Sequence, residues 1–108
     1  MVRWRLRNDG QRPLRLVSAL QPHARFHTDE VDIGPELPPG GTAELALPVR
    51  FSEPPGTVVE NPFLIVRVRE RDTEWRVLAR VRVTAGHDGE PMAGDSVALS
   101  VDRVGDDD

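Results

Sequence analysis

One stretch of the chain, residues 23–32, is rich in residues that could bind a metal ion. It contains two histidines and three carboxylates, which are ligands that divalent metals accept. Imidazoles four positions apart converge on a helix, but on a strand they point the same way about 13 Å apart. Pro22 and Phe26 favour a loop that leads into a strand. We therefore predict a polar loop here and no metal site.

A second group of possible ligands lies near the C-terminus and includes His87, Asp88 and Glu90, with Asp95 nearby. Its spacing is not that of an EF-hand, and Asp88 followed by glycine is expected at a turn. The chain has no cysteine, which excludes disulfides, thiolate metal sites and cysteine nucleophiles. None of its serines lies in the motif that exposes a hydrolase nucleophile. We predict no cofactor and no enzymatic activity.

Arginine is the other residue type that could carry a function. All 14 basic residues are arginine, and the 108-residue chain has a formal net charge of −4. Residues 1–25 carry six arginines and one acid, and residues 62–84 carry six arginines and three acids. Residues 26–61 and 85–108 each carry one arginine and seven acids. Because guanidinium groups bind carboxylates as forks and tolerate partial desolvation, the basic segments are candidate contact surfaces.

Short strands must position these side chains. Apolar residues recur with a period of two, ten prolines and nine glycines fall between short apolar segments, and no window has a helical period. Seven strands are predicted, over residues 2–7, 14–20, 26–33, 42–51, 62–71, 74–84 and 97–101. Pro48 restricts the fourth of them to a sheet edge, because proline has no N–H to donate.

Strands joined by turns, with no helix, predict an all-β fold: an immunoglobulin-like antiparallel β-sandwich of about seven strands. The length suits a single domain, which we place at residues 1–104, followed by a flexible acidic tail at 105–108. Because the chain lacks cysteine, its core must be aliphatic, with a few large side chains: Trp4, Phe26, Phe51 and Trp75.

The first residues contain no apolar run of the kind that a signal peptide needs, and no segment is long enough for a membrane helix. Together with the absence of cysteine, this predicts a cytoplasmic protein, unless the chain is a fragment of a longer one.

Two stretches in the first half of the chain resemble a known group of modules. They are residues 6–16, LRNDGQRPLRL, and residues 37–45, LPPGGTAEL. They look like bacterial Ig-like accessory modules, the CARDB-like and major-sperm-protein-like sandwiches, in which a strand meets an N-x-G-x-x-P-L turn and a later L-x-P-G opens the next strand. The resemblance implies a non-catalytic binding or assembly module, and it transfers no site residues.

The two most regular strands form a hairpin, and its face that carries the arginines is the candidate site. A two-residue loop at Asp72 and Thr73 places Arg69 opposite Arg76, a like-charge pair that is unfavourable unless an acid or a partner screens it. Arginine mixed with apolar side chains is typical of protein interfaces. The predicted partner-binding residues are Phe63, Ile65, Arg67, Arg69, Arg76, Leu78, Arg80 and Arg82. The alternative is a solvated face whose arginines pair with neighbouring acids.

The leading functional prediction is a non-enzymatic protein-interaction or assembly module. Its partner is another protein or a second copy, which offers an acidic segment such as residues 26–36. The alternative is a sandwich that binds a small molecule or carbohydrate through end loops at residues 21–30 and 85–95, which exposure of Trp4 or Trp75 would favour. Nucleic acid is not favoured, because the acidic segments oppose a polyanion and no row of aromatic residues is interleaved with the arginines.

Overall fold

The computed structural model describes residues 2–103, with the side chain of Asp95 left out, and these residues form strands and turns only. The strands are β1 (Val2–Arg7), β2 (Leu14–His23), β3 (Phe26–Asp32), β4 (Glu36–Leu37), β5 (Thr42–Leu47), β6 (Val58–Val59), β7 (Phe63–Glu70), β8 (Thr73–Ala85) and β9 (Pro91–Arg103). Each of the seven predicted strands is present, and two very short ones are added.

Three predicted boundaries are wrong by more than two residues, the first being the end of β2, which continues to His23 rather than stopping at residue 20. β5 ends at Leu47, directly before Pro48, where the chain loses a backbone donor. β9 begins at Pro91 rather than at residue 97, because pairing with β8 resumes directly after the turn at residues 87–89. The predicted acidic tail at 105–108 lies outside the described residues.

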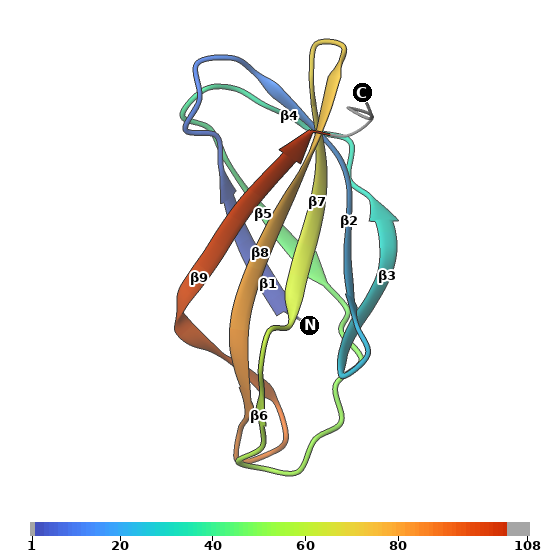
Figure 1. Cartoon of the computed structure of the whole chain (residues 1–108), viewed down its shortest axis with the longest axis vertical. Helices are drawn as coiled ribbons and strands as arrows, with labels where there is room; N and C mark the ends of the chain where they lie inside the picture. The colour runs from blue at the N-terminus through green and yellow to red at the C-terminus, as the bar shows by residue number, and fades with distance from the viewer. Residues whose placement is uncertain (1, 104–108) are drawn as a thin grey trace.

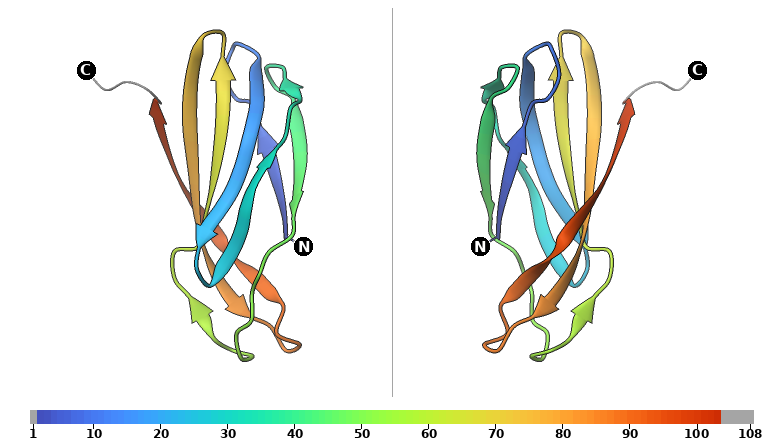
Figure 2. Two further views of the ribbon diagram at one scale, coloured as in Figure 1. Left: turned by 90° about the vertical axis from the view of Figure 1, so that its right-hand side faces the viewer. Right: turned by 90° about the vertical axis from the view of Figure 1, so that its left-hand side faces the viewer.

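The strands pair in antiparallel fashion in two sheets of unequal width (Figure 1). The larger sheet runs β3, β2, β7, β8 and β9, with β4 paired to β2 and β6 to β8. The smaller sheet contains only β1 and β5, with Val2 opposite Leu47 and Arg7 opposite Thr42. The two sheets pack face to face, as Figure 2 shows from both sides. The predicted antiparallel β-sandwich is confirmed, and its immunoglobulin-like type stays a prediction.

The core lies between the smaller sheet and the middle of the larger one. Leu47 of β5 and Leu64 of β7 are each 1% exposed. β1 contributes half-buried side chains to the same cluster, among them Trp4. Phe26 is buried and meets Phe51 edge to face, with ring centroids 6.0 Å apart. The core is therefore aliphatic with aromatic side chains at its periphery.

A buried asparagine joins the two motifs that carry the family resemblance. Asn8 is 3% exposed, and its Nδ2 donates to the carbonyl oxygens of Arg12 at 2.7 Å and Leu37 at 3.0 Å. Its Oδ1 accepts from the backbone N–H of Gly10 at 2.9 Å. Gly40, in the left-handed region at φ 74°, donates its N–H to the Asn8 carbonyl. The two turns therefore form one hydrogen-bonded unit at the end of β1.

A pair of leucine truncations tests where the core ends. We expect Leu64→Ala to lower the free energy of unfolding by about 2–5 kcal/mol, because it opens a cavity between the sheets. Leu99→Ala removes the same atoms from β9, at a residue that is 69% exposed, and should change the free energy by no more than about 0.5 kcal/mol. Equilibrium urea denaturation measures both, and equal losses would contradict this assignment of the core.

Candidate functional site

The predicted hairpin forms, but its register differs from the predicted one. The two-residue turn is at Arg71 and Asp72, and Glu70 pairs with Thr73. Arg71 takes the left-handed conformation, with φ 55°, which places the turn one residue earlier than expected. The predicted opposition of Arg69 and Arg76 is therefore wrong. Each residue of β7 pairs with the residue of β8 two positions before its predicted partner. Because successive side chains alternate between the two faces, a shift of two leaves every side chain on its predicted face.

All eight predicted residues lie on the face of β7 and β8 that points away from the smaller sheet, because they alternate with the inward-facing residues of both strands. The apolar members are half-buried, and Ile65 and Leu78 lie directly opposite each other. Leu20 of β2, also half-buried, lies opposite Ile65 on the other side and extends the apolar centre. Sequence reasoning missed Leu20, because pairing between strands distant in sequence cannot be read from the periodicity. We call this surface the hairpin face.

Arg67 is already engaged by two carboxylates of its own chain. Its Nε and Nη2 donate to Glu74 Oε2 at 2.9 and 2.8 Å, and its Nη1 lies 3.3 Å from Glu30 Oε2. The Ser18 hydroxyl also donates to Glu30 Oε2, at 2.6 Å. The Ser18 hydrogen bond, and after it Arg67, lower the pKa of Glu30. The hydrogen bond to Glu74, and after it the one to Glu30, raise the pKa of Arg67. This cluster fixes the hairpin against β3.

The remaining arginines of the hairpin face differ in their ionic partners. Arg69 reaches Glu74 at 3.5 Å, and Arg82 Nε lies 3.1 Å from Glu60. Arg76 and Arg80 are exposed, and among the side chains that the structure describes no carboxylate lies within 4.0 Å of either guanidinium group. The register neighbour of Arg76 on β9 is Asp102, and that of Arg80 is Ala98. Arg76 and Arg80 are therefore the arginines of this face that remain available for a partner.

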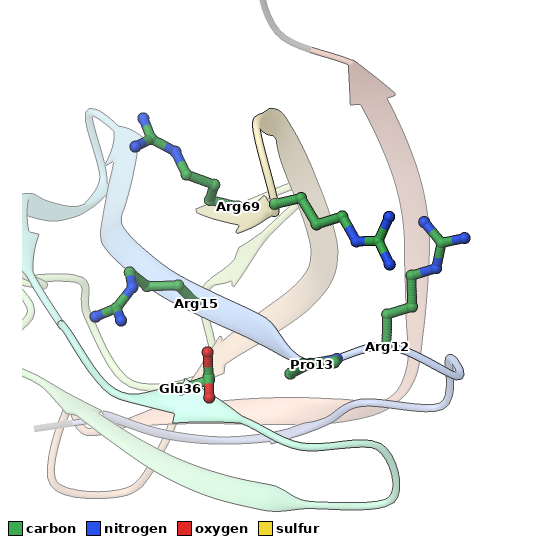
Figure 3. A pocket seen from close by; sticks show the side chains of 6 residues that line it. Arg12, Pro13, Arg15, Glu36 and Arg69 are labelled. Carbon is green, nitrogen blue, oxygen red and sulfur yellow. The ribbon is translucent and has the colours of Figure 1, made fainter.

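A basic hollow of about 340 Å³ adjoins one end of the hairpin face. Arg69 belongs to both surfaces, and the hollow is lined by Arg12, Pro13, Arg15, Glu36, Arg69 and Arg71. Arg15 Nη1 donates to the Gly34 carbonyl oxygen at 3.1 Å. Figure 3 shows the side chains of Arg12 and Arg15 pointing to opposite sides. These two guanidinium groups therefore do not converge on a common anion.

The stretch of histidines and acids is a strand hairpin: the strand predicted from residue 26 is confirmed, and the predicted polar loop is reduced to a two-residue turn. β2 continues to His23 and pairs with β3 from Phe26 onwards, which leaves a turn at residues 24–25. His27 Nε2 lies 2.8 Å from Asp29 Oδ1, and Arg50 Nη2 lies 3.3 Å from the same oxygen. The His27 hydrogen bond, and after it the charge of Arg50, lower the pKa of Asp29. Among the described residues, no group of three or more histidine, cysteine or acidic side chains could hold a metal ion.

The two segments expected to be end loops are mostly strand. Residues 21–30 belong to β2 and β3 except at their turn, and residues 85–95 form a turn near Gly89 between β8 and β9. All five aromatic side chains are buried or half-buried, and Trp4 Nε1 donates to Gln21 Oε1 at 2.9 Å. Trp75 is half-buried and packs against the core, with the Arg103 guanidinium 6.0 Å from its ring centroid.

Comparison of the chain with protein-family models, with the curated proteins and with the solved structures gives no match. The resemblance to CARDB-like and major-sperm-protein-like sandwiches therefore stays a prediction. Within residues 2–103, no helix is long and apolar enough to cross a membrane.

The carboxylate of Glu30 provides a test of the cluster around Arg67. We expect Ser18→Ala and Arg67→Met each to raise the pKa of Glu30, because the first removes the hydroxyl hydrogen bond and the second removes both a hydrogen bond and a positive charge. A lowered pKa means that Glu30 stabilises the fold above its unfolded-state pKa and that this contribution is lost as the pH falls through the folded-state pKa. Carboxyl-carbon NMR titration measures the pKa in each variant. An unchanged pKa of Glu30 in either variant would contradict the geometry.

Proposed function

We propose that this chain is a non-enzymatic protein-interaction or assembly module that binds through the hairpin face. The supporting observation is the pairing of an apolar centre with available arginines. Ile65 and Leu78 are half-buried and adjacent, and exposed Arg76 and Arg80 flank Leu78 on β8. Apolar side chains enclosed by arginines are the composition enriched at protein interfaces.

The chemistry of the partner follows from the charge of this face. Residues 62–84 carry six arginines and three acids, and Glu74 already serves Arg67 and Arg69. Guanidinium forks favour carboxylates, because two parallel hydrogen bonds reinforce the ionic attraction. A partner surface with acids around an apolar contact therefore suits the hairpin face.

A second copy of the chain can supply such acids. In residues 26–36, Asp29 and Glu30 are held by ion pairs of their own chain. Asp32 and Glu36 are exposed, and no arginine of the described residues lies within 4.0 Å of either. Two copies can exchange this contact reciprocally in a symmetric dimer. Without that reciprocity the contact is heterologous and generates a ring or an open chain of copies.

The carbohydrate-binding alternative has no specific observation in its favour. Sugar-binding faces commonly present an exposed aromatic platform, and the two tryptophans of this chain are half-buried against the core. An active site built on His27 or Asp29 has no stronger support, because those side chains pair with each other and with Arg50.

Charge reversal on the hairpin face tests assembly. We expect Arg76→Glu with Arg80→Glu to reduce the oligomer to single chains, because the new carboxylates repel the acidic partner segment. Light scattering at several protein and salt concentrations measures the mass. The matched control is Arg12→Glu with Arg71→Glu, an equal change of charge on exposed residues that line the basic hollow. An oligomer that survives the first double substitution, or is lost equally in the control, would count against the hairpin face.

If the wild-type chain is a single copy at every concentration, the partner must be a different protein, and crosslinking tests that case. A photoreactive phenylalanine analogue placed at Leu78 should form adducts with a partner in the producing cells, and Arg76→Glu with Arg80→Glu should abolish them. The same analogue at Arg12 is the control. No excess of adducts at position 78 over position 12 would refute binding through this face.

A further inference from the structure

A second surface, distinct from the hairpin face, lies where the smaller sheet fails to cover the larger one. Val97, Leu99 and Val101 of β9 pair with Val81, Ala79 and Val77 of β8, so they face the same side as the core. They are nevertheless 48%, 69% and 57% exposed. In both views of Figure 2 the C-terminal end of β9 leans away from the smaller sheet. Within residues 2–103, the inner face of β9 is therefore an apolar surface without a second layer.

A groove runs between this surface and β1. Its main hollow has a volume of about 320 Å³ and is lined by Trp4 and Leu6 on the β1 side and by Val97 and Leu99 on the β9 side. A second hollow of about 280 Å³ continues it towards Trp75 and Val101. Arg7, Leu14, Val68 and Val77 line both hollows. The groove therefore extends from Trp4 past the end of β1 at Arg7 and has an apolar floor.

One edge of β1 is unpaired at this groove. Within residues 2–103, β1 pairs only with β5, which lies on its other side. Arg5 and Arg7 also line the main hollow, so the free edge of β1 faces it. An edge strand presents a row of backbone N–H and C=O groups that can pair with an added strand. Strands in a sheet are about 4.8 Å apart and packed sheets about 10 Å apart, so a strand added to β1 would lie over the inner face of β8 and β9.

The side chains of β1 select what that strand contains. Val2, Trp4 and Leu6 point into the sandwich, and Arg3, Arg5 and Arg7 point outwards. Arg3 lies 3.6 Å from Glu44 and Arg7 2.9 Å from Asp9, and no carboxylate of the described residues lies within 4.0 Å of Arg5. Acids at alternate positions of an added strand would face this row, and cross-strand pairs of opposite charge are favourable.

The same row of arginines disfavours the β1 of a second copy as the added strand. Antiparallel pairing of two β1 strands would bring arginine opposite arginine across the contact, and like charges directly opposite are unfavourable. β9 of another copy is a weaker match than an acidic strand, because only Asp102 among its outward residues Ala98, Ser100 and Asp102 is acidic.

We propose that β1 accepts an extended segment of a partner protein, in which apolar and acidic residues alternate, as a third strand of the smaller sheet. The apolar residues of that segment cover Val97, Leu99 and Val77. Its acidic residues face Arg3, Arg5 and Arg7, and its backbone pairs with the free edge of β1. Since β1 has six residues, a segment of similar length is sufficient.

Synthetic peptides test this proposal on the intact chain. The probe is a peptide of four valine-glutamate repeats with blocked ends, and its matched control replaces every glutamate by lysine. We expect the glutamate peptide to bind, to slow hydrogen exchange of β1 amides, and to bind more weakly at high salt. The lysine peptide should not bind. Calorimetry measures the affinity, and amide exchange followed by NMR gives the location.

Two aspartate substitutions separate the groove from the hairpin face. Leu99→Asp places a charge on the groove wall at a residue that is 69% exposed, so the fold should be retained. It should weaken peptide binding by about tenfold or more, because it removes one apolar contact. Leu78→Asp lies on the hairpin face and should leave peptide binding unchanged.

Four results would overturn the proposal: no binding of the glutamate peptide, equal binding of both peptides, no slowing of exchange in β1, or full binding by Leu99→Asp. A wild-type dimer that Leu99→Asp converts to single chains, without binding of either peptide, would assign the groove to a second copy instead. None of these results affects the crosslinking test of the hairpin face.

Discussion

A sheet of two strands cannot cover a sheet of seven, and this difference in width governs what the molecule buries and what it exposes. β1 and β5 lie over the middle of the larger sheet, and the larger of the two core clusters forms there, around Leu64 and Leu47. β9 alternates apolar and polar residues like any strand with one buried face, yet its inner side chains remain exposed. The groove beside β1 is a direct consequence of this geometry.

The smaller sheet depends on polar ties as well as on apolar packing, because an isolated pair of strands is only marginally stable. Gln21 is fully buried and accepts a hydrogen bond from Trp4 Nε1. Its side-chain amide donates to Thr28 Oγ1 at 2.7 Å. The Thr28 hydroxyl in turn donates to the Pro48 carbonyl oxygen at 2.7 Å. This chain of bonds links β1, β2, β3 and the segment after β5. Asn8 anchors the other end of β1. Buried polar groups lower the stability of the fold unless they are hydrogen-bonded. Here they are hydrogen-bonded, and their bonds fix β1 in position.

The strands could be predicted from the sequence because a period of two is a local property. The distribution of strands between the sheets could not, since it depends on pairings such as Leu20 with Ile65 that join distant segments. The predicted register of the hairpin is wrong for a local reason. The turn begins at Arg71, which takes the left-handed conformation. A residue with a β-carbon adopts this conformation at some cost, so the sequence does not favour a turn there. The motif around Asn8 was visible as a pattern, but its bond to the Leu37 carbonyl needs the folded chain. The alternation of Val97, Leu99 and Val101 was visible too, and only the fold reveals that nothing within residues 2–103 covers them.

The two candidate surfaces differ in the chemistry they can offer a partner. β7 and β8 are paired on both sides, so their backbone groups are used within the sheet and the hairpin face can offer side chains alone. Recognition there must depend on the placement of particular acids and apolar groups. β1 offers a free backbone edge in addition to its arginines, and backbone pairing tolerates many sequences with the same alternation. A partner of the hairpin face therefore needs a folded structure that holds its acidic side chains in a fixed arrangement. A segment that adds to β1 needs only an extended conformation and an alternation of apolar and acidic residues.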